Sequence, residues 1–248
     1  MNILLSGICG HMGNEVLSAS READSGVTVT SGVDPFAKEG IPVPVFKSFD
    51  EVKGDFDCVI DFSNHAATAS LTDFAVKNSL PLVIATTGQT EEQRQMIEKA
   101  SRIIPIFFAA NFSIGVALLC ALAKKTASVM KDAEIEIVEI HHDRKVDAPS
   151  GTAIALADSI CEVRPGSRVV CGRSGHEKRG KDDIGISSVR IGNVVGVHEV
   201  LVGTKYETVT LKHEAHDRAL FASGALAAAK FLVGKEPGLY TMQDMIRI

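Results

Sequence analysis

Two adjacent histidines and a lysine lie close together in the stretch from residue 139 to residue 152. His141 and His142 can exchange protons near neutral pH, because imidazole titrates in that range. Lys145 carries a compact ammonium group that can bind a carboxylate. These residue types indicate proton transfer beside a negatively charged ligand.

The end of the same stretch predicts an anion site at the start of a helix. Ser150 precedes an apolar, alanine-rich run over residues 153–160 and is a suitable N-cap. The backbone amides of Gly151 and Thr152 would then face an anion. Together with the histidines and the lysine, this cradle suggests a small acidic substrate.

Strand geometry sets one condition on the histidines. Residues 133–140 alternate in polarity and predict a half-buried strand that leads into His141. Adjacent side chains on a strand point to opposite faces. His141 and His142 can therefore serve one site only if the strand ends or turns near His142. Otherwise one of the two histidines is structural.

Composition narrows the class of protein. The 248 residues are 45% hydrophobic and carry a formal net charge of −5, which argues against nucleic acid as the main partner. The N-terminus lacks the features of a signal peptide, and no apolar run approaches the roughly 20 residues of a membrane span. Five scattered cysteines favour a reducing compartment, and the contiguous His141-His142-Asp143 is a poor metal site. We therefore expect a cytoplasmic protein without metal, membrane or nucleic-acid partner.

The first half of the chain alternates strand-like and helix-like segments. This alternation is typical of βαβ units on a parallel sheet, and so of an α/β fold. Strands are expected over residues 2–6, 27–33, 43–46, 58–61, 82–85 and 103–108, and helices over residues 12–23, 66–78 and 90–101.

After Asn111 the pattern changes. A long apolar helix is expected over residues 114–130 and a polar loop over residues 172–185. Three strands then follow without helices between them, over residues 185–190, 194–202 and 208–213. Consecutive strands predict an antiparallel, α+β arrangement and hence a second domain. An alanine-rich helix over residues 219–232 closes the pattern.

A glycine-rich loop between the first strand and the first helix predicts dinucleotide binding. It contains Gly7, Gly10, His11, Met12 and Gly13. The glycines permit a tight turn and a close backbone approach to a pyrophosphate at the helix N-terminus. Asp34 ends the second strand, 21 residues after the last glycine, where an acid binds a ribose 2′-hydroxyl. The alternative is a turn that only permits strand–helix packing.

The residue after Asp34 bears on the type of cofactor. It is Pro35, so no guanidinium stands beside the carboxylate to receive a 2′-phosphate. We therefore predict NADH as the preferred cofactor over NADPH. Lys38 or His11 could weaken this preference.

Three further turns follow apolar strands and are expected to line the cofactor. Ligands bind at the carboxyl ends of the strands in such sheets. The turns contribute Phe62, Ser63, Ala85, Thr86, Thr87, Ala110, Asn111 and Phe112. The ring of Phe62 or Phe112 could pack on the nicotinamide. Taken alone, each turn is more typical of an ordinary turn or of core packing.

These stretches together resemble the dihydrodipicolinate reductase family of diaminopimelate and lysine biosynthesis. The most specific match is His-His-x-x-Lys-x-Asp-Ala-Pro-Ser-Gly-Thr at residues 141–152. The glycine loop, residues 59–63, 86–88 and 110–116, and the C-terminal segment 221–240 match as well, so the resemblance spans the chain. Two departures concern the cofactor: Ala85 replaces a usual glycine, and Pro35 stands where some members have a basic residue.

The resemblance implies a fold and a division of the chain. It implies a Rossmann-like, parallel-sheet nucleotide domain formed by residues 1–112 and 219–248. A second α+β domain with a mixed or antiparallel sheet, residues 113–218, would bind substrate and form a homotetramer.

The resemblance also implies a reaction. This is the NAD(P)H-dependent reduction of a cyclic imine dicarboxylate, 4-hydroxy-tetrahydrodipicolinate, to tetrahydrodipicolinate. His141 or Lys145 would supply the proton. The substrate carboxylates would be held by His142, Lys145, Ser150, Gly151 and Thr152.

Two other functions compete with this one. An amino-acid dehydrogenase could share the two-domain plan, but it would not need the carboxylate cradle around Lys145. A non-catalytic dinucleotide sensor would bind NADH without turnover, and should carry a partner-binding or DNA-reading segment that the sequence lacks.

Overall fold

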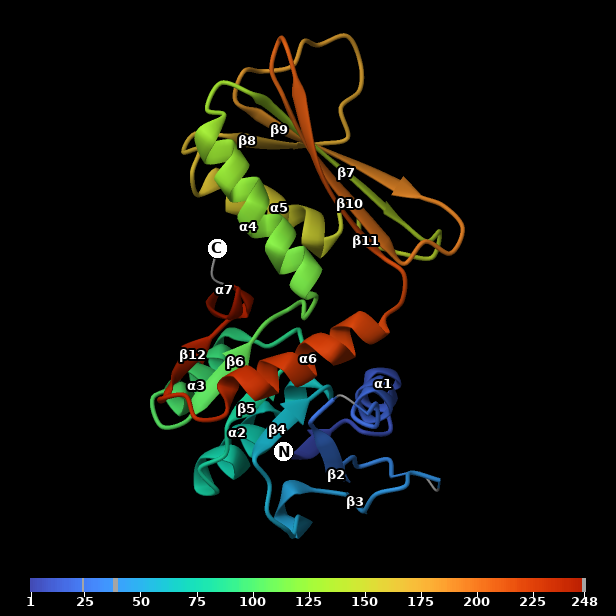
Figure 1. Cartoon of the computed structure of the whole chain (residues 1–248), viewed down its shortest axis with the longest axis vertical. Helices are drawn as coiled ribbons and strands as arrows, with labels where there is room; N and C mark the ends of the chain where they lie inside the picture. The colour runs from blue at the N-terminus through green and yellow to red at the C-terminus, as the bar shows by residue number, and fades with distance from the viewer. Residues whose placement is uncertain (24, 38–39, 247–248) are drawn as a thin grey trace. The chain divides into compact units, whose positions relative to one another are not determined.

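The first sheet is entirely parallel, as expected from alternating strands and helices. The computed structural model describes residues 1–23, 25–37 and 40–246. The strand order is β12-β6-β5-β4-β1-β2-β3 (Figure 1). The strands are β1 (Asn2–Ser6), β2 (Thr28–Val33), β3 (Val45–Phe46), β4 (Cys58–Asp61), β5 (Leu82–Ile84), β6 (Pro105–Phe108) and β12 (Gly238–Tyr240).

Helices cover both faces of this sheet. Cys58, Val59 and Ile60 follow one another along β4 and are all fully buried, which requires cover on each side. Helices α2 (Thr68–Lys77) and α3 (Glu91–Ser101) pack together with strand side chains such as Val59. Helix α6 (Ala219–Leu232) packs on β4, β5 and β6 and against α1 (His11–Ala19). The described residues of 1–112 and 219–246 form one compact unit, called unit 1 here.

Residues Ser113–Arg218 form the other compact unit, unit 2. Its sheet has the order β11-β10-β7-β9-β8. The strands are β7 (Glu134–His141), β8 (Arg168–Cys171), β9 (Asp183–Arg190), β10 (Gly196–Gly203) and β11 (Thr208–Ala215). Two helices, α4 (Ile114–Val129) and α5 (Gly151–Cys161), pack together on one face of this sheet.

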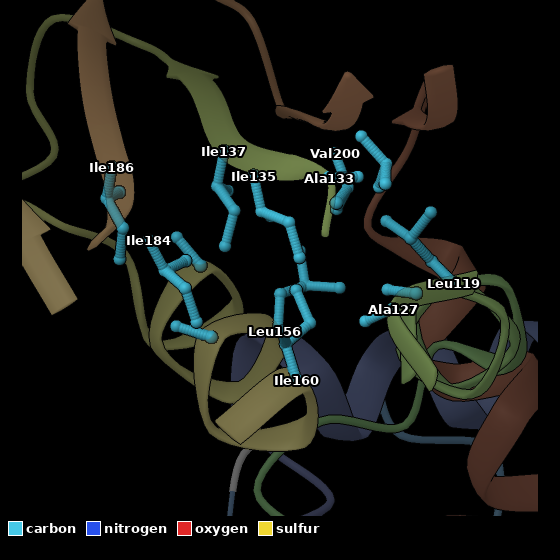
Figure 2. Packing of buried hydrophobic residues seen from close by; sticks show 14 residues of the cluster. Leu119, Ala127, Ala133, Ile135, Ile137, Leu156, Ile160, Ile184, Ile186 and Val200 are labelled. Atoms are coloured by element: carbon cyan, nitrogen blue, oxygen red, sulfur yellow. The ribbon is translucent and has the colours of Figure 1, made fainter. Parts of the chain in front are cut away.

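A continuous apolar cluster joins this sheet to its helices. Figure 2 shows Ile135 and Ile137 pointing from β7 toward the helix that carries Leu156 and Ile160. All four side chains are at most 1% exposed. The alternating pattern predicted for this strand therefore buries its isoleucines against α5.

The second sheet is mixed, which is one of the two arrangements expected for it. Strand β9 runs parallel to its neighbours β7 and β8, whereas β10 is antiparallel to β7 and β11. Although β9 and β10 are consecutive in sequence, β7 lies between them. The connection between them crosses the end of β7, where Ile191 N donates to His141 O and His142 N donates to Val194 O. The crossing is possible because β7 ends at His141.

The remaining differences are local. The first helix begins at His11 and ends at Ala19, earlier than expected, and β3 is only two residues long. The pattern missed β8 and β12, which are short edge strands of four and three residues. Lys38 lies outside the described residues.

Candidate functional site

Predicted cofactor residues of unit 1 gather at one edge of the parallel sheet. They follow the carboxyl ends of β1, β2, β4, β5 and β6, which all point the same way. After these strands come the glycine loop, then Asp34, Phe62 and Ser63, Ala85 to Thr87, and Ala110 to Phe112. Loops at this edge are where doubly wound sheets bind ligands.

The glycine loop owes its shape to close backbone packing. Gly7 has a φ of +78°, and a Cβ there would lie 2.4 Å from Phe62 O. A Cβ on Gly13 would lie 2.2 Å from Gly7 O. Any side chain at either position would therefore displace backbone. Helix α1 begins after Gly10, which provides no side-chain cap for the first turn. Its exposed start therefore has amide donors that a phosphate could bind.

Asp34 fixes the other side of this loop. The carboxylate is 7% exposed. Its Oδ2 accepts from Cys9 N at 3.0 Å and its Oδ1 accepts from Phe36 N at 2.9 Å. Each carboxylate oxygen has a second lone pair, so the group can still accept from a ligand hydroxyl.

The turns after β4 and β5 are held by short local bonds. Ser63 is exposed, and its hydroxyl donates to Oδ1 of the buried Asp61 at 2.5 Å. Thr86 is buried, and its carbonyl accepts from Gln89 Nε2 at 2.8 Å. Thr87 is exposed and Ala85 is half-buried.

The last of these turns contains an aromatic ring that belongs to the core. Phe112 is 2% exposed, and its ring lies 5.7 Å from the ring of Phe107 and 6.2 Å from that of Phe62, centroid to centroid. This burial leaves the ring little surface to offer a nicotinamide. Phe62 is half-buried, so it has the more accessible ring of the two.

A cavity of about 550 Å³ opens at the same region of unit 1. Ser6, Pro35 and Ser63 contribute to its wall, together with Lys47 and Asp50. The cavity therefore adjoins both the residue after Asp34 and the turn after β4.

In unit 2, the sheet face that is apolar along most of β7 becomes ionic at its end. Ile135, Ile137, Glu139 and His141 occupy alternate positions and are all buried. The neighbouring strands also carry titratable residues at this level of the sheet. His198 on β10 lies opposite Glu139, and His213 on β11 lies opposite His198. The end of β7 thus carries a buried row of titratable groups beside the apolar core.

Glu139 is fully buried and accepts from three different parts of unit 2. Its Oε2 accepts from His141 Nδ1 at 2.5 Å, and its Oε1 accepts from Ser150 N at 3.1 Å. Arg190 donates to both oxygens, at 2.8 and 2.7 Å. Burial alone would raise the pKa of Glu139, but these bonds and one from Ser188 outweigh it and lower the pKa to about 2. The carboxylate is therefore ionised at neutral pH.

Burial shifts the pKa of two neighbouring histidines. Burial lowers the pKa of His141, although the bond to Glu139 opposes this. Burial, followed by the charge of His141, lowers the pKa of His198 to about 4. The two rings meet edge to face with centroids 5.1 Å apart. His198 Nε2 lies 3.0 Å from Ser150 Oγ.

Helix α5 begins as predicted. Ser150 is its N-cap, and its hydroxyl accepts from Ala153 N at 3.2 Å. Gly151 is exposed, and a Cβ there would meet nothing within 4 Å. Thr152, the next residue of the helix, is half-buried. Open space therefore adjoins the start of the helix.

The strand condition on the two histidines is met, since β7 ends at His141. His142 lies beyond the strand, and its Nε2 is 3.5 Å from Nη2 of the exposed Arg218. Lys145 follows in the next turn, where its Nζ lies 2.8 Å from Asp147 Oδ1. This pairing lowers the pKa of Asp147. Both His142 and Lys145 are half-buried.

Sequence reasoning missed three residues that surround His141. Glu139, Arg190 and His198 received no role, although the first two contact the predicted proton donor or its partner directly. One signal was available: Glu139 falls at an inward position of a strand whose two preceding inward residues, Ile135 and Ile137, are apolar. A buried acid needs a partner, so its position called for a nearby cation.

Among the described residues, no group of three or more histidine, cysteine or acidic side chains is placed to hold a metal ion. All five cysteines are free thiols. Within the same part of the chain, no helix is both long and apolar enough to span a membrane.

Comparison with known proteins identifies relatives over the full length. Residues 1–112 match the family model for the N-terminus of dihydrodipicolinate reductase, and residues 115–246 match that for its C-terminus. A 4-hydroxy-tetrahydrodipicolinate reductase from Caldanaerobacter subterraneus subsp. tengcongensis is 44% identical, over 100% of this chain and 98% of its own. The protein of that name from Clostridium novyi is 40% identical, over 99% and 98%.

A solved structure agrees with these relatives. It is a dipicolinate-bound dihydrodipicolinate reductase from Paenisporosarcina sp. TG-14, 26% identical, which covers 99% of each chain with a TM-score of 0.84. The chain therefore belongs to the dihydrodipicolinate reductase family, a family of oxidoreductases, as its motifs indicated.

Proposed function

We propose that this member of the dihydrodipicolinate reductase family reduces 4-hydroxy-tetrahydrodipicolinate to tetrahydrodipicolinate with NADH. The observation that carries the proposal lies in unit 2. There one carboxylate, Glu139, binds both His141 and the helix start at Ser150, with Lys145 in the intervening turn. Glu139 thus links a proton-transfer group to an anion cradle. Reduction of an imine that carries two carboxylates requires both. The relative from Paenisporosarcina binds dipicolinate, an aromatic dicarboxylate of similar shape.

The residues of unit 1 fit a nicotinamide dinucleotide. The uncapped start of α1 and the loop from Gly7 to Gly13 would hold the pyrophosphate, and the fixed carboxylate of Asp34 would accept a ribose hydroxyl. His11, Met12, Phe62, Ser63, Ala85, Thr86, Thr87, Ala110, Asn111 and Phe112 would line the rest of the cofactor site. The nicotinamide supplies a hydride when it is bound.

NADH is the proposed preferred cofactor, with NADPH as the weaker alternative. A 2′-phosphate near Asp34 would meet a carboxylate and a proline in place of a guanidinium. Lys47, which lines the adjoining cavity, is one described cation that could reduce this discrimination, and His11 of the glycine loop is another. Steady-state kcat/KM with each cofactor tests the preference, and a tenfold preference for NADPH would overturn it.

Unit 2 would bind the substrate. His142, Lys145, Ser150, Gly151 and Thr152 would hold its carboxylates through an imidazole, an ammonium group, backbone amides and hydroxyls. His141 or Lys145 would give the proton that the reduced ring needs. Because the Thr152 hydroxyl is proposed to bind substrate and not to transfer a proton, its loss should raise KM more than it lowers kcat.

Two further proposals follow from the family. We propose a homotetramer assembled through unit 2, which size-exclusion chromatography with light scattering would test by giving four times the chain mass. We also propose a cytoplasmic location, because five free thiols suit a reducing compartment. Fractionation of cells that express the tagged full chain would test the location.

One coupled assay tests the reaction itself. The substrate is generated from pyruvate and aspartate semialdehyde by the preceding synthase, and loss of NADH or NADPH is followed by absorbance. Oxidation that depends on the synthase supports the proposal. No oxidation with either cofactor would remove it and favour a dinucleotide sensor.

A further inference from the structure

We propose that Glu139 and Arg190 act as a pair of positioning residues that fixes His141 relative to the helix start at Ser150 and to the turn that carries Lys145. The inference rests on the proposed function, because it assigns a purpose to groups around the proposed substrate site. Neither residue is placed to touch substrate in this role, since both act through their neighbours.

The Glu139 carboxylate bonds both to Arg190 and to two parts of the proposed site. Each oxygen of Glu139 accepts one bond from Arg190 and one from a proposed site element: Oε2 from His141 Nδ1 and Oε1 from Ser150 N. These four bonds and the one from Ser188 hold the planar carboxylate, which in turn fixes the direction and the separation of His141 Nδ1 and Ser150 N. His141 and Ser150 are nine residues apart in sequence, yet one rigid group links them.

Arg190 extends the linkage to the turn. Its Nη2 also donates to Asp147 O at 2.7 Å, and the side chain of Asp147 pairs with Lys145. The backbone of the turn is therefore tied to the same guanidinium that binds Glu139. The three proposed functional elements, which are the end of β7, the turn and the start of α5, meet at one buried ion pair.

A stabilising role alone does not account for this arrangement. Buried ion pairs contribute little net stability compared with apolar side chains of similar volume. Glu139 occupies the position after Ile135 and Ile137 on the inward face of β7, where a further apolar residue would extend the core. The ion pair replaces such a residue at the point where the proposed site begins.

The bond from His141 also selects one tautomer. With Nδ1–H donating to Glu139, Nε2 is the ring atom left to exchange a proton with substrate. A Cβ on Gly196 would lie 3.1 Å from that Nε2, so the glycine leaves room beside it. The same logic governs carboxylate–histidine pairs in hydrolases, where neutralising the carboxylate costs about 10⁴-fold in kcat.

The test compares three variants of the full-length protein. Glu139→Gln removes the charge while keeping the shape, and Arg190→Lys keeps the charge while losing the two-point contact. Glu136→Gln is the matched control, because Glu136 also pairs with arginines, Arg173 and Arg179, from the same strand β7. Each variant is measured for kcat, for the pH dependence of kcat/KM, for dipicolinate affinity by calorimetry, and for the His141 tautomer by ¹⁵N NMR.

We expect the Glu139–Arg190 pair to set both the orientation and the protonation of His141. We expect Glu139→Gln to lower kcat by roughly 10²-fold, to weaken dipicolinate binding and to mix the two tautomers of His141. Since Glu139 raises the pKa of His141, the limb of the profile that reports this imidazole should move to lower pH. The other charged or titratable groups that face His141 are Arg190, His198 and Lys145, and this variant leaves their identities unchanged. Arg190→Lys should change each quantity in the same direction by less, and Glu136→Gln should leave all four unchanged.

Two results would overturn the inference. One is a Glu139→Gln variant that keeps kcat within about threefold and a single Nδ1–H tautomer, since an imidazole without its partner would lose both. The other is a Glu136→Gln variant with the same losses. Such losses would then come from reduced stability of unit 2 and not from a positioning role of Glu139. If Glu139→Gln does not fold, Arg190→Lys decides between these outcomes. The NMR and dipicolinate measurements do not depend on turnover, so a failure of the proposed reaction would be distinguished from a failure of this inference.

Discussion

The two candidate sites of this protein are built in opposite ways. In unit 1, the site consists of backbone and small residues: glycines that tolerate no Cβ, and an uncapped helix start. In unit 2, the site depends on side chains that bind one another, and a buried carboxylate serves as their common acceptor. A loop shaped by backbone contacts can bind the pyrophosphate of a dinucleotide, which does not change during the reaction. A site that must accept and release protons needs titratable groups with fixed partners.

The difference predicts different responses to substitution. Loss of one side chain in unit 2 should affect chemistry with little effect on cofactor binding, whereas added atoms in the glycine loop should do the reverse.

Removing the proposed proton donors should give the largest change. His141→Ala or Lys145→Ala is expected to lower kcat by about 10²–10⁴-fold, the usual contribution of general acid catalysis. The KM for NADH should stay near its wild-type value. Arg144→Ala is the matched control, because Arg144 lies in the same turn and contacts only Asp143 and Asn193 among its described side-chain hydrogen bonds. A Lys145→Ala variant with near-wild-type kcat would remove the role given to Lys145.

Acidification should loosen unit 2 selectively. Burial lowers the pKa of His198 to about 4, and also lowers those of His141 and His213. The unfolded chain therefore binds more protons than the folded chain between about pH 6.5 and pH 4, so stability is lost as the pH falls through that window. For His198 the loss reaches about 3 kcal/mol at the acid end. In unit 1, burial raises the pKa of Asp61, so its contribution has the opposite sign.

Hydrogen exchange of the full chain at pH 7 and pH 5 measures this effect unit by unit. Peptides from β7 and β10 should lose protection on acidification, while those from β4 and β5 should keep it. His198→Gln should reduce the pH dependence, and the exposed His176→Gln should not. Equal loss of protection in both units would contradict the prediction.

Adding one methyl group to the glycine loop should weaken cofactor binding and leave substrate-site binding unchanged. Gly13→Ala places a Cβ 2.2 Å from Gly7 O, which the backbone can relieve only by moving. Strain of this kind costs about 1–3 kcal/mol, so KM for NADH should rise roughly 10- to 100-fold. Dipicolinate affinity should not change. Gly203→Ala, where the nearest atom is 3.6 Å from the added Cβ, is the tolerated control.

Replacing the acid at the end of β2 should give the smallest change. Asp34→Ser removes the carboxylate that would repel a 2′-phosphate, and should raise the NADPH to NADH ratio of kcat/KM about tenfold, or 1.4 kcal/mol. Asp50→Ser removes an acid from the wall of the adjoining cavity without touching the glycine loop, and should leave the ratio unchanged. If the Asp34→Ser variant keeps the wild-type NADPH to NADH ratio of kcat/KM, Asp34 does not determine cofactor choice.

The same contrast explains how much the sequence could predict. The parallel sheet, the glycine loop and the N-cap at Ser150 are encoded by neighbouring residues, so local patterns were enough to find them. The contact between Glu139 and Arg190 joins residues 51 positions apart and exists only because β9 pairs with β7. Strand order was the missing information, because β9 and β10 are consecutive in sequence but β7 lies between them in the sheet. Short edge strands such as β12 have too few residues to give a pattern.

The insertion of unit 2 into unit 1 has a consequence for protein synthesis. The ribosome makes residues 113–218 before it makes α6 and β12, yet these last elements belong to the first unit. Until they emerge, β6 lacks its neighbour β12 and the strands β4 to β6 lack the cover of α6. At about 5–20 residues per second, the open strand edge and apolar face persist on the order of ten seconds. During that time the nascent unit 1 is the part of the chain most exposed to aggregation and most in need of a chaperone.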